Sequence, residues 1–231
     1  MKLEVLVSTM HQENYDLINK MNISTDAVVI NQCNNSEYIN LIKDNKKIKW
    51  YNSKDKGLSK SRNKAIELAT EDLCILADDD LEYVKNYKDI IVDSFLQNKD
   101  ADIIAFQIEG IEKKFKNYKS QKKWLGYVGS MKLSSVEVAF RLDSIKKNGI
   151  CFNEYFGAGS RFYMGEENIF LFDCLKRGLK ILYVPIKVAD LHIQNSSWFN
   201  GFDKTYFINR GASFTAMSEK NFAIVNTTVC I

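Results

Sequence analysis

Three consecutive aspartates, Asp78, Asp79 and Asp80, directly follow an apolar stretch from Leu73 to Ala77. Carboxylates this close repel one another and raise one another's pKa unless a cation lies among them. A divalent metal that holds a phosphate-bearing ligand would meet that need. The alternative is that one aspartate caps a helix beginning near Tyr83, because Asp is a preferred capping residue. Capping requires one aspartate rather than three, so the metal interpretation is favoured.

A basic stretch, KGLSKSRN, runs from Lys56 to Asn63 upstream of the aspartates, where a helix is predicted to start. Cations and N–H groups at a helix start bind phosphate oxygens, so this stretch suits a nucleotide diphosphate. An ordinary capped and solvated helix start accounts for the same residues. The glycine signatures G-x-G-x-x-G and G-x-x-x-x-G-K-[ST] are missing. We therefore expect neither a dinucleotide oxidoreductase nor a P-loop enzyme.

Two further carboxylates, Glu166 and Glu167, stand at the start of a helix predicted from Glu166 to Leu175. Carboxylates stabilise a helix dipole at this end, so a well-started helix is one explanation. The preceding stretch from Phe156 to Ser160 contains two glycines, as expected where backbone approaches a ligand. That stretch favours a functional role for the pair.

The elements that position these residues follow an alternating pattern. Apolar stretches predicted as strands alternate with amphipathic stretches predicted as helices, which indicates a mostly parallel sheet covered on both faces. The predicted strands are Leu3–Ser8, Ala27–Asn31, Ile48–Tyr51, Leu73–Ala77, Ile103–Gln107 and Lys180–Val188, and the predicted helices include Leu58–Ala69 and Tyr83–Leu96. Ligands bind beyond the carboxyl ends of parallel strands, which is where the aspartates lie.

Taken together, these motifs resemble a family 2 glycosyltransferase with the GT-A fold. The resemblance runs from Lys2 to about His192 and rests on the first strand ending in Val7-Ser8-Thr9, the basic helix start, the aspartates, and Gly165 with the two glutamates. It implies an α/β fold with a Rossmann-like, mostly parallel central sheet flanked by helices. It also implies one domain, 1–231, in which residues 1–109 bind a nucleotide sugar and residues 110–231 bind the acceptor and supply the catalytic base.

The resemblance gives the aspartates separate roles. They form the family's D-x-D motif, in which Asp78 approaches the ribose, Asp79 is the middle residue, and Asp80 binds Mn²⁺ or Mg²⁺ on the donor diphosphate. His192 follows a predicted strand, and the resemblance implies that it binds the metal or contacts the diphosphate. Neutral imidazole is a suitable ligand for Mn²⁺.

Three residues on the donor side also acquire roles from the resemblance. Ser8 and Thr9 are expected to border the nucleoside, and Arg62 to approach the uracil or the phosphates. Where many relatives have Asp-Gly-Ser after the second strand, this chain has Asn31-Gln32-Cys33-Asn34-Asn35, which leaves recognition of the base open.

The pair Glu166-Glu167 stands where the family usually has Glu-Asp. The second carboxylate is therefore one methylene longer, with a similar ordinary pKa. We expect Glu167 to take the proton from the acceptor hydroxyl, with Glu166 beside it, while the metal stabilises the departing diphosphate. One base suffices for a single displacement, so we expect inversion at the anomeric carbon.

The expected function is transfer of a sugar, of the hexosyltransferase type, from a UDP-linked donor. The acceptor is expected to be a saccharide or lipid-linked saccharide in surface polysaccharide or lipopolysaccharide synthesis. One alternative is a GT-A domain that binds nucleotide sugar or glycan without turnover, since fold does not fix function. Another is a nucleotidyltransferase, but that would require a glycine-rich phosphate loop near the first strand.

Composition limits the remaining partners. The 231 residues carry a net charge of +3, so we expect no nucleic-acid partner. The five cysteines have no metal-finger spacing and suggest reduced thiols. Because the sequence lacks a signal peptide's apolar segment and any run of 18 apolar residues, we expect a cytoplasmic protein.

Two segments leave alternatives open. The run from Glu112 to Trp124 contains six lysines with interleaved aromatics. It is either a solvated lysine face or a contact to an anionic acceptor or to the inner face of the membrane. Aromatic residues further on are expected to pack in the core rather than stack on sugars; they are Trp198, Phe199, Phe202, Tyr206 and Phe207. The apolar tail Phe222–Ile231 is expected to pack on the sheet, to pair between subunits or to precede further residues.

Overall fold

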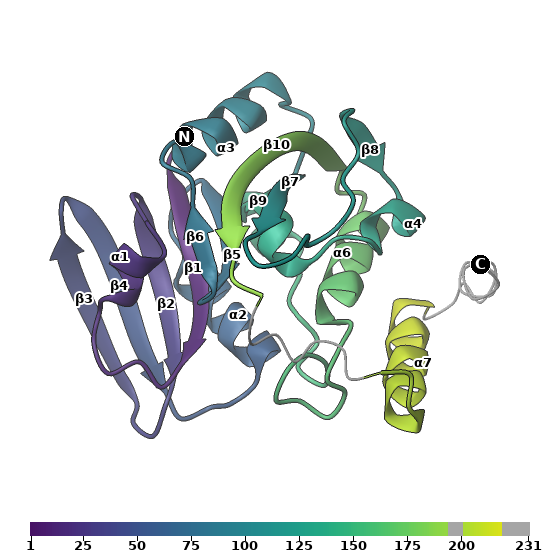
Figure 1. Ribbon diagram of the computed structural model, residues 1–231, viewed down its shortest axis with the longest axis horizontal. Coiled ribbons are helices and arrows are strands. Elements are labelled where there is room, and N and C mark those ends of the chain that lie inside the picture. The colour runs from purple at the N-terminus through teal and green to yellow at the C-terminus, as the bar shows by residue number, and fades with distance from the viewer. Residues whose placement is uncertain (194–200, 219–231) are drawn as a thin grey trace.

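The computed structural model describes residues 1–193 and 201–218. In these residues, a sheet of ten strands has helices on both faces (Figure 1). The strand order is β3-β4-β2-β1-β5-β9-β7-β10-β6, and β8 also pairs with β10. This arrangement confirms the predicted α/β class with a mostly parallel central sheet.

The parallel strands provide the scaffold of the site. They are β1 (Leu3–Met10), β2 (Asp26–Gln32), β4 (Lys46–Ser53), β5 (Leu73–Asp78), β7 (Ile103–Gly110) and β10 (Ile181–Leu191). Successive residues of β1 and β5 are buried on both faces, which explains their almost continuous apolar sequences. All six predicted strands are confirmed, and each extends one to three residues further at its carboxyl end.

The antiparallel strands were not predicted. They are β3 (Glu37–Lys43), β6 (Leu81–Tyr83), β8 (Lys123–Leu125) and β9 (Val138–Arg141). Three of them have three or four residues, and β3 mixes polar and apolar side chains along an edge of the sheet. Such segments lack a clear period in the sequence.

The helix predicted from Tyr83 was wrong at its start. Tyr83 belongs to β6 and pairs with Ala189 of β10, while helix α3 spans Tyr87–Gln97. Leu81 and Tyr83 are both buried and alternate with exposed Glu82, which is a strand period rather than a helical one.

Helices cover the two faces of the sheet in separate sets. One face packs against α1 (Leu17–Lys20) and α3, and the other against α2 (Leu58–Leu68), α5 (Leu142–Lys147) and α6 (Glu166–Lys176). A 3-10 turn, Ser135–Glu137, leads into β9, and two more helices, α4 (Tyr127–Ser130) and α7 (Lys204–Ser218), pack against α6. Figure 1 shows α7 at the periphery of the molecule, away from the sheet.

The expected core packing of the late aromatics was wrong where the structure describes them. Phe202 is 72% exposed and Phe207 is 62% exposed, and both contact Tyr206 near the start of α7. They lie outside the sheet because α7 packs on α6 through its other side, where Ser213 and Met217 are buried. Trp198, Phe199 and the tail Phe222–Ile231 lie outside the described residues.

No helix in the described residues has the length and apolar character needed to cross a membrane. In the same residues the cysteines are free thiols, as expected; Cys74 and Cys174 are buried, whereas Cys151 is exposed. Burial raises the pKa of the Cys74 and Cys174 thiols. Cys230 lies outside the described residues.

Candidate active site

The carboxyl ends of β1, β2, β4 and β5 lie at one edge of the sheet. Pairing places Ser8 level with Asp78 and Thr9 level with Asn31. The Thr9 hydroxyl donates to Asp79 Oδ2 at 2.5 Å. Because these strands are parallel, their polar ends gather where the sequence predicted a ligand.

Ser8 and Thr9 face different surroundings. Ser8 is 5% exposed and accepts a hydrogen bond from the Ser61 hydroxyl of α2 at 2.8 Å. Thr9 is also buried, and its hydroxyl accepts a hydrogen bond from the Gln12 side chain at 3.0 Å. The side chain of Ser8 therefore holds α2 against β1, whereas Thr9 supports the turn that carries Asp79.

Arg62 lies in the interior between the two groups of carboxylates. Its guanidinium donates to Asp78 Oδ1 at 3.0 Å and to Glu166 Oε1 at 3.1 Å, and its side chain is 2% exposed. It also donates to the Ser135 hydroxyl at 2.7 Å and lies over the ring of Phe152. Burial alone would lower the pKa of Arg62, but the carboxylates around it raise that pKa.

The three aspartates have three different environments. Asp78 is held by Arg62, and Asp79 is exposed and accepts from Thr9. Asp80 is partly buried, and burial together with the charges of Asp78 and Asp79 raises its pKa to about 7. Its Oδ1 is buried without a hydrogen-bond partner in the described residues. The helix-capping interpretation is excluded, because strand β6 follows Asp80 directly and Asn86 precedes α3.

His192 lies next to Asp80 through its backbone. Its N–H donates to the Asp80 carbonyl at 3.0 Å, and its ring Nδ1 is 3.2 Å from Glu112 Oε1. The ring is about half exposed. In the described residues no three His, Cys, Asp or Glu side chains form a group that could hold a metal by themselves. Protein carboxylates with substrate phosphates hold Mg²⁺ in many sites, and the unpartnered Asp80 oxygen fits one such ligand.

Glu166 and Glu167 begin α6 as predicted. Gly165 precedes them with a φ of 94°, and a Cβ there would lie 2.5 Å from the Cβ of Ser213 in α7. Glu166 is buried in the ion pair with Arg62, and Glu167 is partly buried beside it. Burial and the adjacent charge of Glu166 raise the pKa of Glu167. The structure therefore separates the pair into one ion-paired carboxylate and one with raised proton affinity.

The stretch from Phe156 to Ser160, which contains two glycines, contacts α2 and the start of α6. Gly157 has a φ of 100°, and a Cβ there would lie 3.2 Å from Glu166 Cδ and from the Ser59 hydroxyl. The carbonyl of the next residue, Ala158, accepts a hydrogen bond from the Leu58 N–H. The glycines thus allow this loop to pack on α2 and on Glu166.

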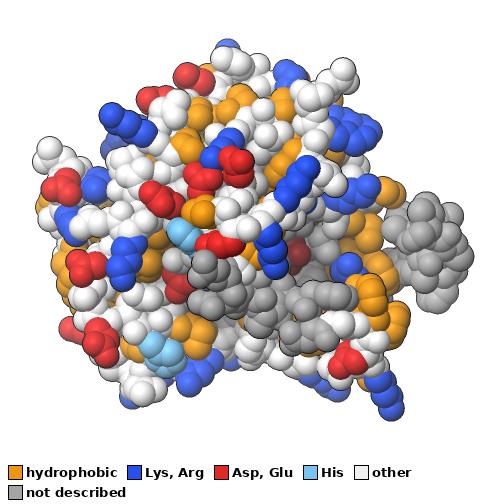
Figure 2. Space-filling model, in the orientation of Figure 1, with side chains coloured by type: hydrophobic (Ala, Val, Ile, Leu, Met, Phe, Trp, Pro, Cys, Tyr) orange, Lys and Arg blue, Asp and Glu red, His pale blue; other side chains and the backbone are white. Residues whose placement is uncertain are grey.

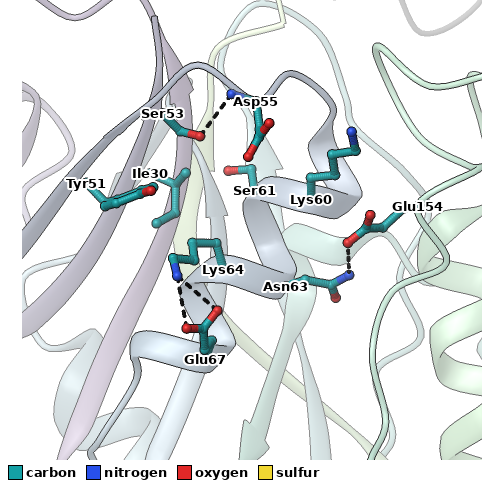
Figure 3. A pocket seen from close by; sticks show the side chains of 10 residues that line it. All are labelled: Ile30, Tyr51, Ser53, Asp55, Lys60, Ser61, Asn63, Lys64, Glu67 and Glu154. Atoms are coloured by element: carbon teal, nitrogen blue, oxygen red, sulfur yellow. Dashed lines mark hydrogen bonds and ion pairs between the residues drawn. The ribbon is translucent and has the colours of Figure 1, made fainter. Parts of the chain in front are cut away.

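The basic helix start opens partly into a hollow of about 390 Å³ between α2 and β4. Figure 3 shows Lys60, Ser61 and Asn63 on its wall, with Asn63 reaching Glu154 at 3.1 Å. Lys64 is paired with Glu67 across the same wall at 2.9 Å. Lys60, Ser61 and Asn63 belong to the basic stretch predicted to suit a diphosphate, but neither the three aspartates nor Ser8, Thr9 and Arg62 line this hollow, so we do not assign it to the donor.

The lysine run lines a second hollow, of about 680 Å³, at the carboxyl ends of β7 and β10. Lys113 and Lys114 line it, and Lys116 is anchored to the carboxylate of Glu137, which is 1% exposed. Glu112 lies on its wall and also contacts His192. Figure 2 shows charged side chains of both signs mixed with apolar ones on the face where β10 lies. The interpretation of this run as a solvated lysine face was wrong at Lys116, which pairs with a buried carboxylate.

Several functional candidates were not predicted. Ser135 belongs to no recognisable motif in the sequence, yet its hydroxyl accepts a hydrogen bond from Arg62. Asn31, whose departure from the family pattern was noted, is buried and donates to Gln12 O at 2.9 Å and to Asn52 Oδ1 at 2.8 Å. Glu112 was predicted only as the start of the lysine run. No motif in the sequence indicated these contacts.

The fold is that of glycosyltransferases of the GT-A class. Residues 25–165 match Glycosyl transferase family 2, which is more than half of the chain. The chain therefore belongs to glycosyl transferase family 2, as the resemblance predicted. No curated protein sequence matches it significantly.

Solved structures support the fold. Residues 1–349 of S. aureus TarS superpose with a TM-score of 0.67 at 14% identity, covering 96% of this chain and 67% of that chain. The same fragment in complex with UDP-GlcNAc gives 0.68 at 15% identity, with 96% and 68% covered. The complex with UDP gives 0.65 at 15% identity, with 96% and 67% covered. A further crystal structure of S. aureus TarS gives a TM-score of 0.66 at 14% identity, with 96% of this chain and 40% of that chain covered.

The raised pKa of Asp80 predicts how stability depends on pH. An unfolded Asp80 titrates near 3.8 and the folded one at about 7, so the folded state keeps a proton that the unfolded state has released. Metal-free stability therefore falls as pH rises from about 4 to about 7. We expect Asp80→Asn to unfold at a higher urea concentration than the parent at pH 8. The free energy of unfolding should be higher by about 1 kcal/mol after solvent screening, and this difference should vanish near pH 4.

The matched control is Asp93→Asn, which changes an exposed carboxylate of α3. It should leave the midpoint of unfolding unchanged at both pH values. An Asp80→Asn variant that is less stable than the parent at pH 8 contradicts the assignment of an uncompensated carboxylate.

Proposed function

We propose that the protein is an inverting glycosyltransferase that uses a UDP-linked sugar. The acceptor is a saccharide or lipid-linked saccharide in surface polysaccharide or lipopolysaccharide synthesis. The observation that carries the proposal is the division of the carboxylates. Asp78 and Glu166 form ion pairs with Arg62, whereas Asp80 and Glu167 have raised proton affinities and form no ion pair within the described residues. Membership of family 2 and the UDP-GlcNAc and UDP complexes of TarS support a nucleotide-sugar donor.

Donor binding falls to the half formed by residues 1–109. Asp79 and Asp80 lie in the turn after β5, beside the ends of β1 and β2 where Thr9 and Asn31 are held. We propose that Asp78 and the ends of these strands receive the nucleoside. Arg62 is too deeply buried to reach it freely, so we assign Arg62 a positioning role in place of the expected direct contact.

A divalent metal, Mn²⁺ or Mg²⁺, fits the chemistry of Asp80. The unpartnered buried oxygen and the raised pKa indicate a carboxylate suited to a cation, and His192 is the adjacent candidate ligand. When bound, such a metal stabilises negative charge on a departing diphosphate as a Lewis acid.

Glu167 is the proposed general base. Raising the proton affinity of a carboxylate toward the working pH makes it more effective at accepting a proton from a hydroxyl. Glu166 is held by Arg62 at 3.1 Å and so fixes the start of α6 that carries Glu167. One base acting on one acceptor gives a single displacement, which inverts the anomeric carbon.

The acceptor is proposed to enter from the half formed by residues 110–231. The hollow lined by the lysine run adjoins Glu112, which contacts His192 beside Asp80. This chain of contacts supports an acceptor position beside the proposed metal site. Its mixed lining of lysines, glutamates and aromatics is suited to a polar acceptor.

Metal-dependent donor binding tests the role of Asp80. Titration of UDP in a calorimeter should give strong binding with Mn²⁺ and weak binding with excess chelator. We expect Asp80→Asn to weaken the Mn²⁺-dependent binding at least tenfold, because the variant removes the charge that faces the cation. Asp93→Asn should bind like the parent.

If UDP binds equally well with and without chelator, the metal assignment fails. If no nucleoside diphosphate binds under either condition, the donor assignment fails as well.

Replacing the base separates an enzyme from a binding domain. Glu167→Gln keeps size and hydrogen bonding but cannot accept the proton, so the release of UDP from the sugar donor with acceptor present should fall about a hundred- to ten-thousandfold. UDP affinity should stay within about twofold. Glu166→Gln should reduce the rate less, because Glu166 pairs with Arg62 and holds the start of α6 but does not accept the proton.

Parental rates in both glutamine variants would exclude a carboxylate base at the start of α6. A parent that binds nucleotide sugar but shows no turnover with any acceptor of a broad saccharide panel would favour the binding domain.

The pH dependence of the rate provides an independent check. The raised pKa of Glu167 means that its carboxylate ionises well above the ordinary glutamate value of 4.5. At saturating donor and acceptor, we expect kcat to rise with pH along a single-proton limb whose midpoint lies well above 4.5. Glu167→Gln should flatten that limb. A midpoint at or below 4.5 contradicts the proposed environment of the base.

A further inference from the structure

Strand β3 forms a free edge of the central sheet. It pairs with β4 along one side and stands at the end of the strand order, and Figure 1 shows no other described element beyond it. Its outer side therefore presents unpaired backbone N–H and C=O groups. Proteins usually protect such an edge with proline, a bulge or a covering segment. The seven residues of β3 contain no proline, and their register with β4 is continuous.

The side chains of β3 leave apolar surface uncovered. Ile42 is 83% exposed and Tyr38 is 46% exposed, and both point to the same face of the sheet because they are four residues apart. On the other face, Ile39 and Leu41 are partly buried against the core. Ile42 is the most exposed of the large apolar side chains in the described residues.

The sequence of β3, EYINLIK, complements itself when it is reversed. In an antiparallel pair centred on Asn40, Glu37 lies opposite Lys43 of the second copy, and Tyr38 lies opposite Ile42. Ile39 then lies opposite Leu41. Each contact occurs twice by symmetry, so the pair brings charge to opposite charge and apolar side chain to apolar side chain throughout.

We propose that two copies of this chain associate through β3, which pairs antiparallel with β3 of the second copy about a two-fold axis at Asn40. The association joins the two ten-stranded sheets into one continuous sheet and covers the exposed Tyr38 and Ile42. It is independent of the proposed function, because no residue of the candidate active site lies on β3.

Electrostatics within the hairpin favours this partner and register. Lys43 lies opposite Lys46 of β4, and Glu37 lies opposite the uncharged Asn52. In the described residues neither Glu37 nor Lys43 forms an ion pair, whereas Lys46 is 3.7 Å from Asp44. The second copy supplies each with an opposite charge. A shift of one copy by one residue would bring side chains from opposite faces of the two sheets across from each other and lose these pairs.

The association is expected to be reversible. One pair of strands buries less surface than the roughly 1,200–2,000 Å² of stable interfaces. We therefore expect monomer and dimer to exchange at chain concentrations in the range of about 10–100 µM, as measured by sedimentation velocity of the full chain.

Charge reversal tests the register. Glu37→Lys and Lys43→Glu should each weaken dimerisation about tenfold or more, because two attractive pairs become repulsive. The double variant E37K/K43E exchanges the charges and should restore dimerisation to within about threefold of the parent. Lys88→Glu and Asp93→Lys, which reverse exposed charges on α3, are matched controls and should leave it unchanged.

Cross-linking tests the axis directly. Residues directly opposite in an antiparallel pair have Cα atoms about 4.5–5.5 Å apart, within the range that a disulfide spans. Asn40→Cys should therefore form a dimer under mild oxidation, while the parent and Lys47→Cys should not. A parent that stays monomeric up to about 100 µM overturns the proposal. So does a double charge variant that fails to recover, or an Asn40→Cys chain that does not cross-link.

Discussion

The arrangement of the candidate active site depends on the burial of one positive charge. Arg62 is 2% exposed, and removing a guanidinium from water costs several kcal/mol unless carboxylates and hydrogen-bond acceptors surround it. Asp78, Glu166 and Ser135 meet most of that requirement from three separate parts of the chain, and only the Arg62 Nε has no partner in the described residues. The same charge therefore fixes α2 to the end of β5 and to the start of α6, so Asp78 and Glu166 are held by a common partner.

This constraint divides the acidic residues by environment. Asp78 and Glu166 are neutralised inside the protein, while Asp80 and Glu167 remain as carboxylates whose pKa is raised by burial and neighbouring charge. Uncompensated carboxylates cost stability in the empty protein, and a cation or an acceptor hydroxyl gives each of them a partner. Arg62 thus sets the positions of the carboxylates that the proposed transfer requires.

The sequence allowed the parallel scaffold and the positions of the key carboxylates to be predicted, because both depend on local patterns. Apolar strands such as Leu73–Asp78 are recognisable by composition, and aspartates that follow a strand end must lie at the ligand-binding edge. The antiparallel strand Val138–Arg141 was not recognisable, because it has four residues and owes its place to neighbours on both sides. Its insertion between β5 and β7 is a tertiary effect that no local period encodes.

The contacts of Arg62 show the same limit at the level of the site. A cation in a helix start is ordinarily solvated or bound to a ligand, and its sequence neighbours give no sign of burial. Only the packing of Phe152, Ser135 and Glu166 around it, from segments more than 70 residues away, places it inside. The free edge at β3 likewise could be recognised only once the strand order was known.

The central claim is that Arg62 couples the two groups of carboxylates, and a double-mutant cycle on unfolding measures that coupling most directly. The free energies of unfolding of the parent, Arg62→Leu, Glu166→Gln and the double variant are compared in urea at pH 7. The account predicts that the two changes are strongly non-additive, with a coupling energy of about 1–3 kcal/mol, because removing the cation leaves Glu166 buried and unpaired. A coupling energy near zero would show that the ion pair does not hold the site together.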